Sequence, residues 1–467
     1  MNLIIQGGRI YDSKNNVNGD VRDLFIKDGM IVDGFAGNAE KIIDAGGKAV
    51  MAGGIDIHSH IGTYGLNVMR GTYGFYSPWE IGYTYAKMGY THVNEPFMTQ
   101  LTASSVHHEL SSIPILDTSS FLVLNLRDIE GRIKTTKYIE EVETILGVIM
   151  AKTKAIGLKI YEPFVRYAQR MFIMRNVKAQ KVLNLLSGLR MESFPRIIMH
   201  TSPDLLKEEI ENPENFHFSH VGSAMDNEDA YQKILEYISR GASVDLGLFD
   251  FAKNLKVLNS KETQGELCGS VDMGLLEPLL FSHSKTPETE APFLALNLAL
   301  SEPFKSISFS TDSPTNASFK AYPEIFAWLM KAENREGLFQ RELPAFEYSL
   351  FDISRITRQN PAGVLGLCNK GHLGVGAEAD IAVYDINEET KAHELKDRLS
   401  ECAFLIKGGE VVIEDHKILN DQPEKKTYYR GIGASDDEAA KILARYSTLR
   451  FGNLTVEDVF TAKEIQV

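Results

Sequence analysis

Cysteine is scarce in this chain of 467 residues. The three cysteines, Cys268, Cys368 and Cys402, lie far apart, and no Cys-x-x-Cys motif occurs. Because iron–sulfur clusters and structural zinc sites use several clustered thiolates, this spacing argues against both kinds of site. We expect the three cysteines to be small buried side chains in a reducing compartment, the cytoplasm.

The chain also lacks an excess of positive charge and any long apolar segment. Its formal net charge of −14 argues against a nucleic acid or an anionic membrane surface as a partner. No apolar segment approaches the roughly 20 residues that a membrane-spanning helix needs. The N-terminus, residues 1–8, lacks the basic start and the long apolar stretch of a signal peptide. We therefore expect a water-soluble cytoplasmic protein with no membrane span.

Two segments rich in predicted strands flank the middle of the chain. Short apolar stretches between Gly, Asn and Asp turns predict strands at 2–6, 8–11, 23–27, 30–33, 41–45, 379–385, 403–407 and 410–414. We interpret residues 1–53 and 371–425 as one small β-sandwich domain built from both chain ends. Residues 422–430 are polar and are interpreted as a connector to a C-terminal tail, residues 426–467.

The middle of the chain, residues 54–370, alternates between predicted strands and predicted helices. The strands are expected at 54–58, 90–93, 121–126, 157–161, 196–200, 217–221, 242–248 and 306–310. Helices are expected at 77–87, 138–154, 176–189, 229–240 and 291–301. Eight strands alternating with helices predict an α/β fold, a (β/α)8 TIM-like barrel. Active sites of such barrels lie at the C-terminal ends of the strands, so polar residues at those ends are the functional candidates.

The first predicted barrel strand ends in two histidines, His58 and His60, one residue apart. Side chains alternate across a strand, so residues i and i+2 point the same way. Both imidazoles can therefore face one metal ion from a rigid strand end. Unrelated surface or core histidines give the same spacing, so the other strand ends decide the interpretation.

Polar residues that could share this site lie at the ends of four further strands. They are Lys159 on the fourth strand, His200 on the fifth, His220 on the sixth and Asp312 on the eighth. Together with the histidine pair they place four histidines, one lysine and one aspartate on one face of the barrel. Lys159 lies among apolar residues, where an ammonium group is awkward to bury. The alternative is that its head group extends to solvent at the barrel mouth.

In these six residues, taken in strand order, the chain resembles the amidohydrolase superfamily. The resemblance implies two divalent metal ions held by His58, His60, Lys159, His200, His220 and Asp312. It also implies that carbon dioxide carbamylates Lys159, which then bridges the two ions as a carboxylate, because an unmodified ammonium could not ligate a cation. Zinc is the default metal for a site of histidines and carboxylates.

Longer stretches of the sequence resemble one branch of that superfamily. They cover nearly the whole chain and include residues 88–96, 107–110, 311–314, 322–330, 348–350, 356–362, 365–367 and 370–382. They are similar to the family formed by the first subunit of formylmethanofuran dehydrogenase, and to the first subunit of a formyltransferase/hydrolase complex of methylotrophic bacteria. The resemblance implies one-carbon metabolism (methanogenesis or methylotrophy), a formylated amine carrier such as a methanofuran-like molecule, and other subunits of such a complex as partners.

The chain departs from this branch in two loops that should touch the substrate. The third strand ends in residues 124–128, where a Gly-Asn-Asn-like stretch is expected. Residues 201–203 stand in place of an Asn-rich loop after the fifth strand. These departures leave open a different formamide, or another amide, as the substrate.

The implied reaction is hydrolysis of a formyl amide, or its reverse, the condensation of formate with an amine. Divalent ions acidify bound water, so hydroxide is available at neutral pH to attack the formyl carbon. Asp312 would take the proton from that water and give it to the leaving amine, as a general acid–base catalyst.

Other polar residues receive structural interpretations. His217 lies three residues before the predicted ligand of the sixth strand and should face the opposite side, in core or helix packing. His107 and His108 either line a substrate entrance or have solvated or capping roles. His92 and Glu95, near the end of the second strand, could support the metal ligands.

Three function classes remain open. The first is a formyl-amide hydrolase inside a multisubunit one-carbon complex. The second is a stand-alone cyclic amidase of the dihydropyrimidinase kind, and the third is a non-catalytic scaffold subunit that keeps the barrel only to hold partners. The complete set of six residues argues against the scaffold, and the branch-specific stretches argue against the cyclic amidase. Genomic neighbours encoding a formyltransferase or a tungsten or molybdenum enzyme would support the first class.

Overall fold

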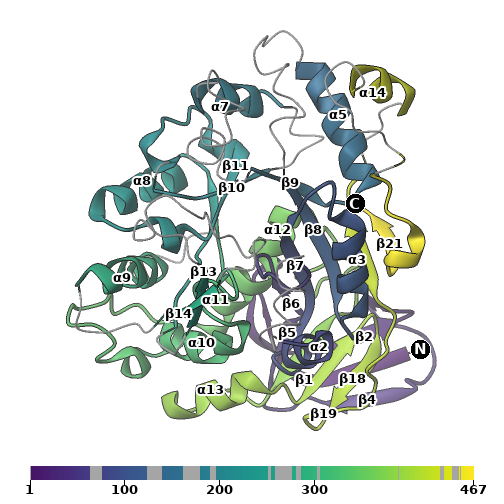
Figure 1. The fold of residues 1–467 in the computed structure, drawn as a ribbon. Helices are drawn as coiled ribbons and strands as arrows, with labels where there is room; N and C mark the ends of the chain where they lie inside the picture. The colour runs from purple at the N-terminus through teal and green to yellow at the C-terminus, as the bar shows by residue number, and fades with distance from the viewer. Residues whose placement is uncertain are drawn as a thin grey trace.

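The structure is a computed structural model of the chain. It describes residues 2–63, 76–123, 139–160, 179–189, 196–203, 205–250, 254–257, 276–279, 286–301, 306–387, 389–431, 436–443, 452 and 454–467. The predicted ends of the third and fourth barrel strands, at 124–128 and Tyr161, lie outside the described residues, as does Cys268. A sheet built from strands between residues 2–52 and 381–418 lies beside a larger part made of strands and outer helices (Figure 1).

Among the described residues, the first sheet has nine strands and draws them from both ends of the chain. Their order is β19-β18-β17-β16-β5-β1-β2-β3, with β4 beside β1. They are β1 (Asn2–Asp12), β2 (Val17–Lys27), β3 (Met30–Val32), β4 (Lys41–Asp44), β5 (Ala49–Ala52), β16 (Ile381–Tyr384), β17 (Phe404–Lys407), β18 (Glu410–Glu414) and β19 (Lys417–Ile418). The two ends meet where β5 runs antiparallel to β16, with Val50 opposite Val383. The predicted β domain built from both chain ends is therefore confirmed as a sheet domain.

In the described part of the chain, eight parallel strands form the barrel, in the order β6-β7-β8-β9-β10-β11-β12-β15. They are β6 (Gly54–Asp56), β7 (Tyr90–Met98), β8 (Asp117–Val123), β9 (Gly157–Ile160), β10 (Ile197–His200), β11 (Phe216–Ser219), β12 (Ser243–Asp245) and β15 (Ile307–Ser308). The first and last strands meet through Ser59, which pairs with Ser313, and the N–H of His60 donates to the Ser313 carbonyl at 2.8 Å. The predicted TIM-like barrel is confirmed.

Helices cover the outside of the barrel strands, with α7, α8 and α9 on one flank in Figure 1. The helices are α2 (Pro78–Lys87), α3 (Ala103–Ser112), α5 (Ile139–Lys152), α7 (Ala179–Ser187), α8 (Glu228–Ser239), α9 (Thr286–Ser301), α10 (Tyr322–Met330), α11 (Leu350–Ser354), α12 (Asn360–Leu365), α13 (Ala392–Ser400) and α14 (Asp436–Leu443). A further hairpin consists of β13 (Asn254–Val257) and β14 (Leu276–Leu279). Among the residues that the structure describes, no helix combines the length and hydrophobicity that crossing a bilayer requires.

The C-terminal tail joins the barrel sheet, so the prediction of a polar connector at 422–430 is wrong. Strand β20 (Lys426–Tyr429) pairs with β8 at Thr427 and with β21 (Lys463–Gln466). Tyr428 is buried in an apolar cluster with Ile55 of β6. The strand is short and follows directly on charged residues, which gave this segment its polar character. The tail therefore covers the end of the barrel opposite the strand C-termini.

The two described cysteines differ in exposure. Cys402 is buried, and burial raises the pKa of its thiol to about 12. Cys368 is exposed, so the expectation of three buried cysteines is wrong for this residue. The reason is local, because Cys368 follows α12 and its left-handed C-cap, Gly366, in a surface turn.

Candidate metal centre

His58 and His60 lie immediately after β6, which ends at Asp56. The Asp56 carboxylate fixes this turn, because it accepts hydrogen bonds from the N–H of His58 at 2.9 Å and from the hydroxyl of Tyr85 at 2.6 Å. His58 is fully buried and His60 is 9% exposed. Their Nε2 atoms lie 3.1 Å and 3.3 Å from Oδ1 of Asp312. The pair at the end of the first strand therefore faces the residue expected from the eighth.

The residues from the fourth, fifth and sixth strands approach the same point. Nζ of Lys159 lies 3.2 Å from Nε2 of His58, and Nδ1 of His200 lies 3.1 Å from Nε2 of His220. The ring centroids of His58 and His220 are 5.0 Å apart. Nε2 of His220 thus connects the His200 side of the group to the His58 side.

Asp312 completes the group from the eighth strand. One potential ligand atom from each of His58, His220 and Asp312 lies within 4.8 Å of the other two. Burial alone would raise the pKa of Asp312, but the charges and contacts of His220, His58 and His60 hold it well below its usual range. The carboxylate is therefore ionised at neutral pH. The structure brings all six predicted residues together.

The chemistry of these side chains fits divalent metal ions. Burial is the main cause that lowers the pKa of His200 well below its usual range and the pKa of His220 to about 4. Both imidazoles are consequently neutral, as metal ligands must be. Nδ1 of His220 contacts Oγ of Ser223 at 2.8 Å, which leaves Nε2 for the centre. Among the described residues, none makes a well-aligned hydrogen bond to the buried Oδ1 of Asp312, and a bound cation would satisfy it.

Two buried carboxylates contact the histidines of this group. Glu95 on β7, which the sequence suggested as a supporting residue, lies 3.2 Å from Nδ1 of His60. Asp245 at the end of β12 lies 3.4 Å from Nδ1 of His58, and sequence reasoning missed it. The signal was hidden because the predicted strand ran to residue 248, with Asp245 in its middle, whereas the observed strand ends at Asp245.

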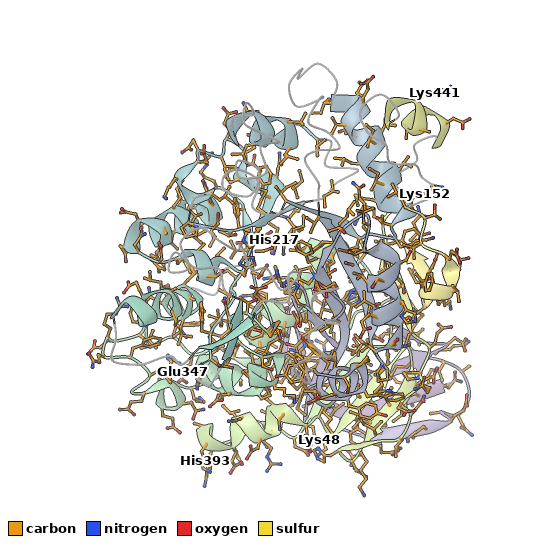
Figure 2. All side chains as sticks on the ribbon, viewed as in Figure 1. Lys48, Lys152, His217, Glu347, His393 and Lys441 are labelled. Carbon is orange, nitrogen blue, oxygen red and sulfur yellow. The ribbon has the colours of Figure 1, made fainter. Side chains whose placement is uncertain are left out.

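His217 points into the barrel, so its predicted place on the face opposite His220 is wrong, although it is buried in the core as one of the two predicted packings required. On the same strand Phe218 faces outwards and stacks on Tyr237 of α8, with ring centroids 4.9 Å apart. Nε2–H of His217 donates to Asp245 at 3.0 Å, in the middle of the view in Figure 2. The prediction counted strand alternation up to His220, but His220 lies beyond β11 in a left-handed conformation (φ 38°), where alternation no longer holds.

The remaining histidines have structural contacts. Nε2–H of His92 donates to Oγ of Ser119 at 2.9 Å, and its ring packs against Tyr428. His107 is buried and donates to the carbonyl of Thr153 at 2.9 Å, so it does not line an entrance. His108 is exposed. The sequence suggested that His92 could support the metal ligands. Its contacts with Ser119 and Tyr428 place it near the covered end of the barrel instead.

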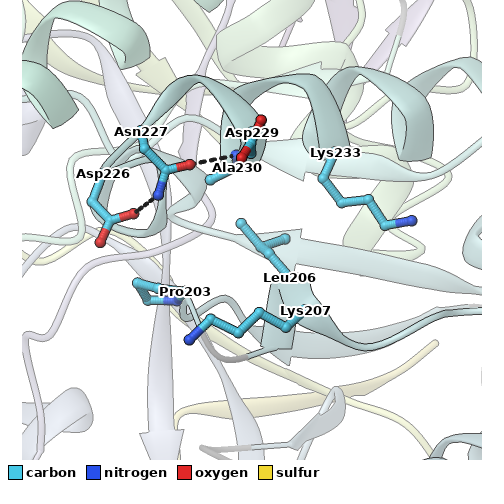
Figure 3. A pocket seen from close by; sticks show the side chains of 8 residues that line it. All are labelled: Pro203, Leu206, Lys207, Asp226, Asn227, Asp229, Ala230 and Lys233. Carbon is cyan, nitrogen blue, oxygen red and sulfur yellow. Dashed lines mark hydrogen bonds between the residues drawn. The ribbon is translucent and has the colours of Figure 1, made fainter.

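A pocket of about 470 Å³ lies between the loops that follow β10 and β11 and the start of α8 (Figure 3). Its lining includes Pro203, three residues after His200, and Asp226, six residues after His220. Asn227 caps α8 by accepting from the N–H of Ala230 at 3.0 Å, and this cap forms one wall. Lys233 extends from α8, the same helix, and Lys207 lies across from it beside Pro203 and Leu206 in Figure 3.

Known proteins are similar to this chain in sequence. The amidohydrolase family matches residues 294–413. Protein FwdA of Methanocaldococcus jannaschii is 27% identical over 98% of this chain and 97% of its own length. The A component of the formyltransferase/hydrolase complex Fhc of Methylorubrum extorquens is 26% identical over 89% of each chain. The predicted resemblance to amidohydrolases and to this branch is confirmed.

A solved structure supports the fold over the full length. The crystal structure of the formyltransferase/hydrolase complex FhcABCD of Methylorubrum extorquens, in complex with methylofuran, contains a chain that covers 100% of this one and of itself, with a TM-score of 0.84 and 23% identity. That similarity establishes the same architecture. Together with the match to the amidohydrolase family, the relatives support an enzyme.

Proposed function

We propose that the chain is a metal-dependent formyl-amide hydrolase of one-carbon metabolism in the cytoplasm, or that it runs the reverse condensation of formate with an amine. The observation that carries the proposal is the convergence of six donor side chains from five barrel strands on one buried point. In the proposal His58, His60, Lys159, His200, His220 and Asp312 hold two divalent ions, with zinc as the default metal. Lys159 is carbamylated and acts as a bridging carboxylate.

The bound ions would supply a nucleophilic hydroxide and would polarise the formyl oxygen. The chain's own contribution is to hold the donors rigidly and to move a proton. Asp312 lies beside both histidines of the first strand and is ionised, so it can accept a proton and return it to the leaving amine. The barrel limits the access of bulk water to this step, because five of the six side chains are at most 9% exposed and His200 is half-buried.

The relatives support the proposed substrate and partners. One relative is named as part of a formyltransferase/hydrolase complex, and the matching solved complex holds methylofuran. We extend this to a formylated amine carrier of the methanofuran kind and to docking with other subunits of such a complex. The loop after His200, which departs from the branch, also contributes Pro203 to the pocket in Figure 3, so it could adjust which carrier binds.

The runner-up is a stand-alone cyclic amidase of the dihydropyrimidinase kind, which would use the same six residues. The scaffold hypothesis is less favoured, because a scaffold has no need to keep six buried donors in contact. The relatives that match nearly the whole chain include one named for formyl-group chemistry, which supports the first hypothesis over the second.

Hydrolysis assays on the purified, metal-loaded protein separate these hypotheses. The substrates are an N-formylated furfurylamine as a mimic of the carrier, hydantoin and dihydrouracil. We expect formate release from the formamide and no ring opening. Ring opening without formate release would establish the cyclic amidase, and inactivity on all three in a protein that binds two ions per chain would favour the scaffold.

A further inference from the structure

The barrel strands β7 and β12 supply none of the six predicted metal ligands, yet each carries a buried acid beside them. Glu95 lies on β7 and Asp245 is the last residue of β12, and neither is exposed to solvent. A buried carboxylate is costly unless its oxygens are satisfied, so the partners of each acid show what holds it there.

Glu95 holds the segment that carries His60. Its Oε2 accepts hydrogen bonds from the N–H groups of Ile61 and Gly62 at 2.9 and 2.7 Å, and its Oε1 accepts from the N–H of Phe97 at 3.0 Å. The same Oε1 lies 3.2 Å from Nδ1 of His60, whose Nε2 faces the centre. One side chain therefore fixes the backbone after His60 and places a carboxylate oxygen beside Nδ1 of its ring.

Asp245 contacts two of the predicted ligands at once. Its Oδ1 accepts from the backbone N–H of His220 at 2.7 Å, and its Oδ2 lies 3.4 Å from Nδ1 of His58. His217 and Ser310 donate to the same carboxylate. Asp245 thus joins the His58 side of the centre to the His220 side.

The backbone around His220 shows why this contact matters for geometry. His220 adopts φ 38° and ψ 50°, a left-handed conformation that is unfavourable for a residue other than glycine. A Cβ atom at Gly247, two residues after Asp245, would lie 2.7 Å from Cα of His220, so the two segments are closely packed. The Asp245 hydrogen bond and this close approach hold His220 where its ring reaches the centre.

We propose that Glu95 and Asp245 are positioning residues that orient the predicted ligand histidines through Nδ1 and, for His220, through the backbone. Histidine ligands commonly donate their second ring nitrogen to such a carboxylate, which fixes the tautomer and raises the basicity of the ligand. The proposal rests on the metal centre of the proposed function, and it is independent of which amide is hydrolysed.

Zinc affinity, measured by chelator competition on the full-length protein, tests this role. The variants are Glu95→Gln and Asp245→Asn, which keep side-chain size and remove the charge. Asp117→Asn is the matched control, because Asp117 is an equally buried acid on β8, ion-paired to Lys407 at 2.6 Å at the opposite end of the barrel. We expect affinity to fall about 10–100-fold in the first two variants and to stay unchanged in the control.

Two further measurements distinguish positioning from general destabilisation. Thermal unfolding of the metal-free proteins should show Asp117→Asn at least as destabilised as the other two. The visible absorption bands of bound Co²⁺ should shift in Glu95→Gln and Asp245→Asn but not in the control, because only positioning residues alter ligand geometry. If either isosteric variant does not fold, Glu95→Asp or Asp245→Ser carries the same test.

The outcomes separate this proposal from the proposed function. Wild-type affinity and unshifted Co²⁺ bands in both positioning variants would overturn the positioning role and leave the metal centre intact. A wild-type protein that binds neither Zn²⁺ nor Co²⁺ would overturn both proposals. Loss of affinity with no formamide hydrolysis in the wild type would support positioning while rejecting the proposed substrate.

Discussion

Oδ1 of Asp312, just past the last barrel strand, lies 3.1 Å from Nε2 of His58, just past the first. The contact depends on closure of the barrel, where Ser59 pairs with Ser313. Because every barrel strand is parallel to its neighbours, the ends of all eight strands point the same way, and residues remote in sequence meet. The candidate centre is thus a consequence of closure, and its donors are held at the ends of packed strands.

Lys159→Ala is expected to abolish metal binding and hydrolysis together. Lys159 lies between the His58 and His200 sides of the centre. A carbamate there would be a shared ligand of the two ions that we expect each chain to bind. Elemental analysis of the purified variant checks the metal content. Added short carboxylic acids, such as formate or propionate, should restore part of both properties.

Lys154→Ala is the control for that experiment. Lys154 lies shortly before the same strand and pairs with Glu464 at 2.6 Å, away from the centre. It should keep wild-type metal content. Full metal content in Lys159→Ala would show that no carbamate bridge exists.

Asp312→Asn is expected to keep the fold and much of the metal but to lose turnover by about 100-fold or more, the usual effect of removing a general acid–base catalyst. The carboxylate contacts both histidines of the first strand, and its low pKa keeps it ionised, which is the form that can accept a proton. Steady-state kinetics with metal-loaded protein measure the effect. Turnover within a few-fold of wild type would reject Asp312 as the proton shuttle.

The sequence was sufficient to predict the barrel and the six residues that converge in it. Strand ends can be recognised by apolar stretches that stop at a polar residue, and barrel topology then places those ends together, as for Lys159 and His200. The same logic failed for His217, because the chain leaves regular strand geometry at His220 (φ 38°). Such a conformation depends on tertiary contacts with Asp245 and Gly247, which no local pattern reveals.

The C-terminal strand shows a second limit of sequence reasoning. Strand β20 has four residues and only becomes a strand because β8 and β21 offer it partners. Its tyrosine, Tyr428, is buried by residues from β6 and from the segment around α12. Packing against neighbouring strands, and not local propensity, determines whether short segments of this kind form strands.

Stability should fall at mildly acidic pH because of His107. Burial lowers the pKa of His107 to about 4, while the carbonyl of Thr153 and the charge of Glu464 only partly oppose this. An unfolded chain has a histidine pKa of about 6.5, so between about pH 6.5 and 4 it binds a proton that the folded state excludes. Stability is therefore full above about pH 6.5 and decreases towards about pH 4, by about 2–3 kcal/mol.

Urea unfolding of wild type and His107→Gln at about pH 7.5 and 4.5 measures this dependence of stability on pH. The glutamine side chain is uncharged throughout and can still donate to Thr153, so the variant should lose about 2–3 kcal/mol less than wild type over this interval. Other buried groups, including His92, titrate in both proteins and cancel in the comparison. Equal pH dependence in the two proteins would contradict the assignment.

Lys407→Met is expected to destabilise the protein by about 3 kcal/mol, because it removes one partner of a buried ion pair. Lys407 on β17 of the sheet domain lies 2.6 Å from Oδ1 of Asp117 on barrel strand β8. Lys370 lies 2.8 Å from the other oxygen, and the two lysines hold the pKa of Asp117 well below its usual range despite burial. The loss is measured as the free energy of unfolding in urea.

Lys463→Met makes the same change in an exposed pair. Lys463 lies 2.9 Å from Glu424, and both side chains are more than half exposed, so its loss should cost less than about 1 kcal/mol. Both variants should bind metal normally, since Asp117 lies at the covered end of the barrel. A cost for Lys407→Met no larger than that for Lys463→Met would show that the buried pair contributes nothing to stability.

Purification of the tagged chain from its native source is expected to recover a stable complex with a formyltransferase-like or formate-dehydrogenase-like subunit. Other reactions must pass on the formyl group of the amine carrier and must supply or consume formate. This chain shows no cofactor motif for those reactions. Strands β20 and β21 of the tail are not free to bind such partners, because both are part of the barrel sheet and Tyr428 is buried. Partners should therefore dock at the C-terminal face of the strands, where substrate enters. Recovery of this chain alone or as a homo-oligomer, fully active on a small free formamide, would contradict the prediction, since an open and self-sufficient site needs no neighbour to deliver its substrate.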